Sequence, residues 1–253
     1  MKIVVNNQLI NYSDEGKGDV VLLLHGWGAS LQTFDAMTNS LVRNYRVVRL
    51  DFPAFGGSPR PTNSWSVGDY ADNIIGFLDK IGIKKVAVVI AHSFGGRVTI
   101  KLAGEGKLKP GKIILIDSGG IRHSSSPRQR AYKLLAKTGK QVFRIPGLNK
   151  VGDAARRRLY QGAGAMDYFE VGDEMRETFI RIINEDVRDI AANIQHPTLI
   201  IWGEDDKETP VVDGEIFHDK ISGSKFKIIT HAGHFAYLDQ PDEVMKEIES
   251  FLK

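Results

Sequence analysis

The stretch that decides the fold is VAVVIAHSFGGRVTI, from Val86 to Ile100. Its first half is an apolar, mostly β-branched run that ends at Ala91, which is typical of a buried strand. A helical pattern resumes at about Gly95, so no room remains for an ordinary loop. The chain must therefore turn sharply from strand to helix, and a single serine, Ser93, stands at the apex.

Such a turn forces its apex residue into a strained backbone conformation, and the flanking chain passes so closely that only small side chains fit. Ala91, Gly95 and Gly96 meet this demand. The turn lifts the Ser93 hydroxyl clear of the sheet and leaves the amide of Phe94 at a helix N-terminus, where it can stabilise an anionic oxygen. The pattern predicts a nucleophilic serine, with a plain helix cap as the alternative.

Apolar runs alternate with amphipathic segments along most of the chain. After an opening hairpin of Lys2–Val5 and Gln8–Tyr12, the strand runs are Val20–Leu24, Tyr45–Leu50, Val86–Ala91, Ile113–Asp117, Thr198–Trp202 and Lys225–Thr230. The helical segments are Leu31–Val42, Val67–Ile81, Gly95–Ala103 and Pro241–Leu252. This alternation indicates an α/β fold with a mostly parallel sheet covered on both faces, and with ligands at the carboxyl ends of its strands.

The stretch from Gly120 to Gln195 interrupts this alternation, because its pattern is helical and strongly charged throughout. Basic residues dominate Arg122–Arg158, and acidic residues dominate Tyr160–Asp189. We expect successive helices to pair through these opposite charges, while a basic patch for an anionic substrate or surface is the alternative. We interpret residues 120–195 as an inserted helical cap, or lid, on a core of residues 1–119 and 196–253.

The composition limits the class of protein. The chain has 253 residues, 42% of them hydrophobic and 26% charged, as in an ordinary globular enzyme. Its net charge of +3 is too small to indicate a nucleic-acid partner. Cysteine is absent, which excludes disulfides and a thiolate nucleophile and suits a reducing compartment. We expect a cytoplasmic protein with neither signal peptide nor membrane span, since the longest apolar run is VVLLL.

An activated serine needs a base within hydrogen-bond reach and a carboxylate that orients the base. Two further strand ends supply candidates. The sequence IIWGEDDKETP begins at Ile200 and offers acids, and HAGHFAYLDQP begins at His231 and offers histidines. In chain order, the three motifs give serine, acid and histidine.

With these motifs the sequence resembles the α/β-hydrolase superfamily over nearly its whole length. The resemblance is carried by the turn around Ser93 and by HGWG at His25–Gly28, DFPAFGGS at Asp51–Ser58, WGEDD at Trp202–Asp206 and HAGH at His231–His234. It implies an eight-stranded sheet and a catalytic triad of Ser93, Asp206 and His234. Asp205 is the second choice for the acid, and Asp117 occupies an alternative placement known in the superfamily.

The resemblance also implies an oxyanion hole made by the backbone amides of Trp27 and Phe94. Ala54 and Ala91 stand where the superfamily more often has glycine, and neither departure removes a reacting group.

The other histidines are given supporting roles. In the resembling proteins, His25 would support the loop before the oxyanion glycine, and His92 would lie beside the nucleophile. His231 is expected to form local hydrogen bonds. Structural or exposed roles are expected for His123, His196 and His218. No pattern such as HExxH is present, so neither a metal nor a cofactor is expected.

The resemblance implies an esterase-like hydrolase that forms an acyl-enzyme and then releases it with water. Trp27 and Phe94, with apolar cap residues, favour a small and largely apolar acyl substrate. These cap residues are Phe143, Leu148, Tyr160, Met166, Tyr168 and Phe169, although packing within the cap is their alternative role.

Other functions remain open beside this one. A C–C bond hydrolase acting on a diketone-type substrate is the first alternative, and a cofactor-free perhydrolase is a lesser one. A small-ligand receptor with little turnover is the alternative from another class. Dehalogenase and epoxide hydrolase chemistry is disfavoured, because those relatives carry an aspartate where this chain has Ser93.

Overall fold

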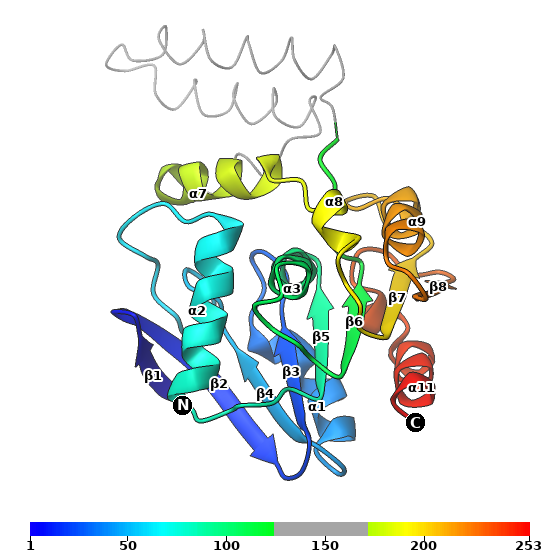
Figure 1. Ribbon diagram of the computed structural model, residues 1–253, viewed down its shortest axis with the longest axis horizontal. Helices are drawn as coiled ribbons and strands as arrows, with labels where there is room; N and C mark the ends of the chain where they lie inside the picture. Colours follow the sequence, from blue (N-terminus) through cyan, green and yellow to red (C-terminus); the bar gives the residue numbers. More distant parts are fainter. Residues whose placement is uncertain (124–171) are drawn as a thin grey trace, which may run out of the picture. The chain divides into compact units, whose positions relative to one another are not determined.

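The computed structural model describes residues 1–123 and 172–253, and this part contains an eight-stranded sheet (Figure 1). The strand order is β1-β2-β4-β3-β5-β6-β7-β8. The bounds are Lys2–Val5 (β1), Gln8–Gly16 (β2), Val20–Leu24 (β3), Arg46–Leu50 (β4), Val88–His92 (β5), Lys112–Ile116 (β6), Thr198–Gly203 (β7) and Lys225–Ile229 (β8). The β1–β2 and β2–β4 pairs are antiparallel, and all other pairs are parallel. The predicted mostly parallel α/β sheet is confirmed.

Helices connect most of the parallel strands. Their bounds are Leu31–Phe34 (η1, a 3₁₀ turn), Asp35–Leu41 (α1), Val67–Lys80 (α2), Phe94–Gly104 (α3), Gly172–Asn184 (α7), Arg188–Ala191 (α8), Val211–Lys220 (α9), Ala236–Asp239 (α10) and Pro241–Leu252 (α11). A reciprocal capping box between Ser66 and Asp69 fixes the beginning of α2. Within the described part of the chain, every helix is too short or too polar to cross a membrane.

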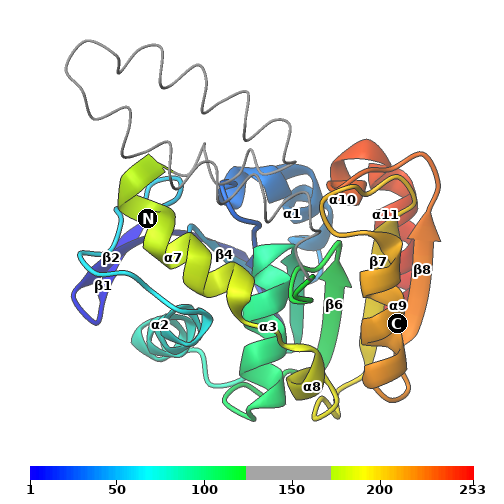
Figure 2. The ribbon, with the colours of Figure 1, turned by 90° about the horizontal axis from the view of Figure 1, so that it is seen from above.

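The sheet has a hydrophobic core on each face, because successive side chains of a strand point to opposite sides. In β6, Ile114 and Ile116 belong to the core that contains residues of α1 and α11. Ile113 and Leu115 belong to the core that contains residues of α3, α8 and α9. Figure 2 shows these two groups of helices on opposite sides of the sheet. The central strands β3 to β7 are thus buried on both faces, which holds their carboxyl ends rigidly.

The chain divides into two compact units, Met1–Ile121 with Glu185–Lys253, and Arg122–Asn184. The first unit contains the whole sheet. In it, the Val187 amide donates to the Gly120 carbonyl at 2.9 Å, so the chain leaves and re-enters this unit at adjacent points. The described part of the second unit is α7 together with Arg122 and His123 at the unit's first end.

Most of the predicted cap, residues 120–195, lies outside the described residues, so its role as a lid stays a prediction. The pairing of its basic and acidic helices also lies largely outside them. So do the pocket residues predicted there, Phe143, Leu148, Tyr160, Met166, Tyr168 and Phe169. The last part of the predicted cap, from Glu185 onward, belongs to the unit that contains the sheet.

Candidate active site

The predicted site residues lie at the carboxyl ends of neighbouring parallel strands. Ser93 follows β5, Asp117 follows β6, Asp206 follows β7, and His234 follows β8. Trp27 follows β3, which pairs with β5 at the edge of β5 that faces away from β6. Because parallel strands end at the same edge of a sheet, residues far apart in the sequence come together at this edge.

Ser93 occupies the strained turn that the sequence predicts between β5 and α3. Its φ is +50° and its ψ is −111°, a backbone conformation that non-glycine residues rarely adopt. The turn is tight, since a Cβ atom on Gly95 would lie 2.2 Å from the Leu24 carbonyl oxygen. Gly95 is therefore required here by the close approach of β3. The turn presents the hydroxyl of Ser93 at the edge of the sheet.

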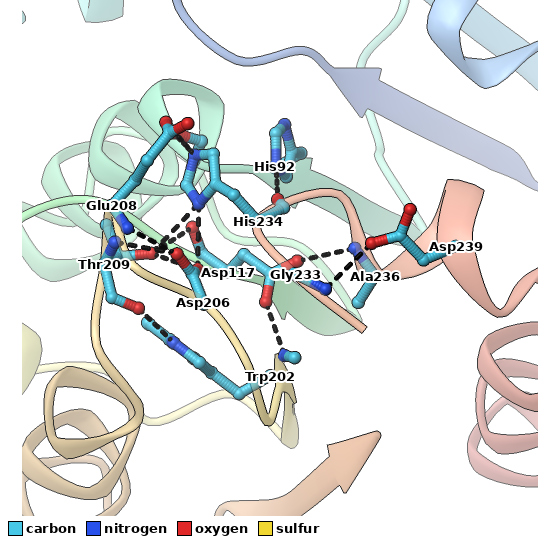
Figure 3. Close-up of polar contacts among 12 residues, drawn as sticks. His92, Asp117, Trp202, Asp206, Glu208, Thr209, Gly233, His234, Ala236 and Asp239 are labelled. Atoms are coloured by element: carbon cyan, nitrogen blue, oxygen red, sulfur yellow. Dashed lines mark hydrogen bonds and ion pairs between the residues drawn. The ribbon is translucent and has the colours of Figure 1, made fainter. Parts of the chain in front are cut away.

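His234 forms hydrogen bonds with both of its predicted partners. Its Nε2 atom lies 2.9 Å from the Ser93 Oγ, and its Nδ1 atom lies 2.8 Å from the Asp206 Oδ2. Figure 3 shows the imidazole above the Asp206 carboxylate. The carboxylate accepts the proton of Nδ1, so Nε2 is left as an acceptor for the serine hydroxyl. This geometry can activate a serine.

The Asp206 side chain is fully buried and accepts several hydrogen bonds besides that of His234. The amides of Glu208 and Thr209 donate to Oδ1 at 2.8 and 3.0 Å, and the Thr209 hydroxyl donates to Oδ2 at 2.7 Å. Burial would raise the pKa of Asp206, but the bonds from His234 and Thr209 lower it below its ordinary value. Asp206 is therefore ionised and fixed in orientation.

The pKa of His234 reflects two opposing effects. Burial lowers the pKa, but the hydrogen bond and charge of Asp206, helped by the charges of Glu208 and Asp117, raise it above the ordinary value. An imidazolium that forms during a reaction is thus stabilised by its surroundings.

Asp117, the alternative acid, forms hydrogen bonds with two backbone amides instead of with His234. Its Oδ1 accepts from the Gly203 amide at 2.7 Å, and its Oδ2 accepts from the Ala236 amide at 3.0 Å. Burial raises the pKa of Asp117 to about 7. The carboxyl joins the end of β7 to the start of α10 and so holds the acid-bearing and histidine-bearing segments together. Asp205, the second choice, is exposed.

Two buried histidines support the site through backbone contacts. The His92 Nε2 donates to the carbonyl of His234 at 2.7 Å, and burial lowers the pKa of His92 to about 3. The His25 Nδ1 donates to the Gly26 carbonyl at 2.7 Å, and its Nε2 accepts from the Phe52 amide at 2.9 Å. Burial lowers the pKa of His25 to about 4, so both rings are neutral and hold loops in place.

The two predicted oxyanion donors lie in an aromatic environment. Phe94 is the first residue of α3, so its amide has no acceptor within the helix. The rings of Trp27 and Phe94 meet edge to face with centroids 5.6 Å apart, and Phe55 packs on Trp27 at 4.8 Å. This side of the nucleophile is therefore apolar.

Sequence reasoning missed two residues of the site, Thr209 and Glu208. A hydroxyl three residues after Asp206 is a recognisable signal, because aspartate often accepts hydrogen bonds from the residues that follow it in a turn. The contact of Glu208 with His234 has no comparable signal in the sequence, since it depends on how β7 and β8 place their loops.

Residues 21–247 match the model of the alpha/beta hydrolase family, so the chain belongs to this family. The match agrees with the sheet topology and supports the assignment of the chain as a hydrolase.

Two curated relatives and one solved structure illustrate the similarity. An uncharacterized hydrolase, YugF, of Bacillus subtilis is 26% identical over 98% of this chain and 95% of its own length. A 2-hydroxy-6-oxo-6-phenylhexa-2,4-dienoate hydrolase of Comamonas testosteroni is 24% identical over 97% and 91%. The structure of an esterase from Exiguobacterium antarcticum superposes with a TM-score of 0.76 at 22% identity, over 99% and 98% of the two chains. At this identity the superposition shows the shared fold alone.

Proposed function

We propose that this protein is a serine hydrolase that cleaves small, largely apolar carboxylic esters, or similar acyl substrates, through an acyl-enzyme on Ser93. The observation that carries the proposal is the chain of hydrogen bonds from the Ser93 hydroxyl through His234 to Asp206. The buried carboxylate of Asp206 and the strained backbone of Ser93 support it, since burying a charge and straining a backbone both cost free energy and strained residues cluster at functional sites.

The mechanism follows from two hydrogen bonds, one from His234 Nδ1 to Asp206 and one from the Ser93 hydroxyl to His234 Nε2. His234 Nε2 takes the hydroxyl proton as the Ser93 Oγ attacks the acyl carbon, and Asp206 stabilises the imidazolium. The amides of Trp27 and Phe94 donate to the oxyanion, each worth about 2.7 to 4 kcal/mol at comparable sites. The imidazolium then protonates the leaving alcohol. Water, deprotonated by His234, attacks the acyl carbon; the bond to the Ser93 Oγ breaks, the imidazolium returns its proton to that oxygen, and the acid is released.

The substitution Ser93→Ala tests the proposal. We expect it to abolish hydrolysis of p-nitrophenyl butyrate and labelling by a fluorophosphonate, with an unchanged circular dichroism spectrum. Ser40→Ala, which replaces an exposed serine of α1, is the matched control and should keep both activities. Undiminished turnover in the Ser93→Ala protein would refute the assignment.

A C–C bond hydrolase is the second candidate, favoured by the similarity to the dienoate hydrolase of Comamonas testosteroni. The same serine, histidine and acid can catalyse both reactions, so only the substrate that the protein turns over distinguishes the two functions. A panel of p-nitrophenyl esters of graded acyl length, together with one 2-hydroxy-6-oxo-dienoate, separates the two. Turnover far below about 1 s⁻¹ on the whole panel, with tight binding of one ligand, would favour a receptor instead.

A further inference from the structure

Glu208 places a second carboxylate at the imidazole of His234. Its Oε2 atom lies 3.3 Å from His234 Nε2 (Figure 3). The same nitrogen lies 2.9 Å from the Ser93 hydroxyl. Asp206, in contrast, contacts the opposite nitrogen, Nδ1. The two carboxylates therefore contact different nitrogens of the imidazole. Asp206 contacts Nδ1, and Glu208 lies beside Nε2, the nitrogen that faces Ser93.

Glu208 is not suited to orienting the imidazole. While Nδ1 of His234 carries the proton, Nε2 presents a lone pair, and a carboxylate cannot donate a hydrogen bond to it. The Glu208 side chain is also 65% exposed, whereas that of Asp206 is fully buried. The effect of Glu208 at this nitrogen therefore comes from its charge, which also raises the pKa of His234.

That charge is close to the point of attack. The two contacts at Nε2 place the Glu208 carboxylate within about 6 Å of the Ser93 Oγ. The acyl carbon must come within bonding distance of this oxygen. A carboxylate carried two or three bonds further along the acyl group then lies at most about 11 Å from Glu208, a separation comparable to the Debye length of about 8 Å at physiological ionic strength.

We propose that Glu208 is a specificity-determining residue that makes the site select uncharged acyl groups and reject those with a carboxylate near the scissile carbonyl. The inference rests on the proposed function and narrows its substrate class. Repulsion between unit charges at this separation and partial exposure corresponds to about a tenfold difference in kcat/KM. The same repulsion acts on the carboxylic acid released by deacylation and favours its departure.

Two esters of matched shape test the inference. Monomethyl succinate and methyl 4-methylpentanoate differ in that a terminal carboxylate replaces an isopropyl group of similar shape, and titration of the released acid follows the hydrolysis of both. We expect the wild-type protein to prefer the neutral ester, and the ratio of the two kcat/KM values to fall about tenfold in Glu208→Gln. Added salt should reduce the wild-type ratio, because it screens an exposed charge.

Glu204→Gln is the matched control, because it removes the same charge from an exposed residue of the same loop. We expect it to leave the ratio at the wild-type value. An unchanged ratio in Glu208→Gln, or an equal fall in Glu204→Gln, would overturn the inference while leaving the proposed function intact. A wild-type protein inactive on both esters would instead overturn the proposed function and, with it, this inference.

Discussion

At the scale of the residue, the raised pKa of His234 predicts the pH dependence of the proposed activity. The base must be neutral to accept the Ser93 proton, so kcat/KM should fall tenfold per pH unit below the pKa of the imidazole. Because Asp206 raises that pKa, the acid limb should lie above pH 6.5, the ordinary value for histidine. A pH profile of p-nitrophenyl butyrate hydrolysis measures it.

The variant Asp206→Asn provides the contrast. It removes the carboxylate that raises the pKa of His234, so the acid limb should move to lower pH. The rate should also fall by about 10³- to 10⁴-fold, because an amide no longer fixes the proton on Nδ1. An acid limb that stays in place would mean that another group controls it.

The same shift of His234 also affects stability. Since the pKa is raised in the folded protein, the protonated imidazole stabilises the fold, fully below about pH 6.5. This contribution is lost as the pH rises through the folded-state pKa. The site is thus most favourable for folding in the protonation state that cannot start the reaction.

The residues that the sequence did predict share one property. Ser93, Asp206 and His234 each stand in a short motif directly after a strand, so local pattern and strand order together indicate that they meet. Thr209 and Glu208 contact these residues through the exact path of the loop between β7 and α9. A loop path depends on long-range packing, which a single sequence does not reveal.

At the scale of the element, the contact between α3 and β3 depends on Gly95. A Cβ at this position would meet the backbone oxygen of Leu24 at 2.2 Å, and a backbone atom cannot move aside as a flexible side chain can. We expect Gly95→Ala to destabilise the protein by about 1 to 3 kcal/mol and to displace the turn that carries Ser93. Thermal unfolding and the labelling rate with a fluorophosphonate measure the two effects.

Gly68→Ala is the control for this prediction. Gly68 lies in α2, where an added Cβ would make an ordinary contact of 3.5 Å with the Ser66 hydroxyl. Alanine is the better helix former, so this variant should be as stable as the wild type or slightly more stable. Equal stability of the two variants would mean that α3 can move away from β3 without loss.

Local pattern located most elements but not their full extent. The predicted hairpin strand Gln8–Tyr12 continues to Gly16, because its second half pairs with β4, from Tyr12 opposite Leu50 onward. The predicted helix Leu31–Val42 begins with a 3₁₀ turn. The helix Val211–Lys220 was not predicted, since its apolar residues do not recur at helical spacing. In the first case, the deciding interaction is with a distant strand.

At the scale of the whole molecule, we propose that the unit Arg122–Asn184 is a separable lid. The hydrogen bond from Val187 to Gly120 holds the two ends of the insertion side by side within the other unit. A short linker can join such ends, and replacing the insertion by this linker changes the entropy of loop closure only slightly. Replacing residues 122–184 by a short Gly-Ser linker should leave a core that unfolds cooperatively and still labels at Ser93, with altered preference among acyl lengths.

A longer replacement, of residues 120–195, should behave differently. It also removes Val187, Ala191 and Ile194, which are fully buried in the core on the α3 side of the sheet. Burial of a valine or isoleucine side chain contributes about 1.5 to 3 kcal/mol, so losing Val187 and Ile194 costs about 3 to 6 kcal/mol, a large part of the stability of an ordinary domain. Circular dichroism during heating compares the two proteins. Two proteins of equal stability would mean that the core does not need residues 185–195, and two unfolded proteins would mean that the core depends on the insertion itself.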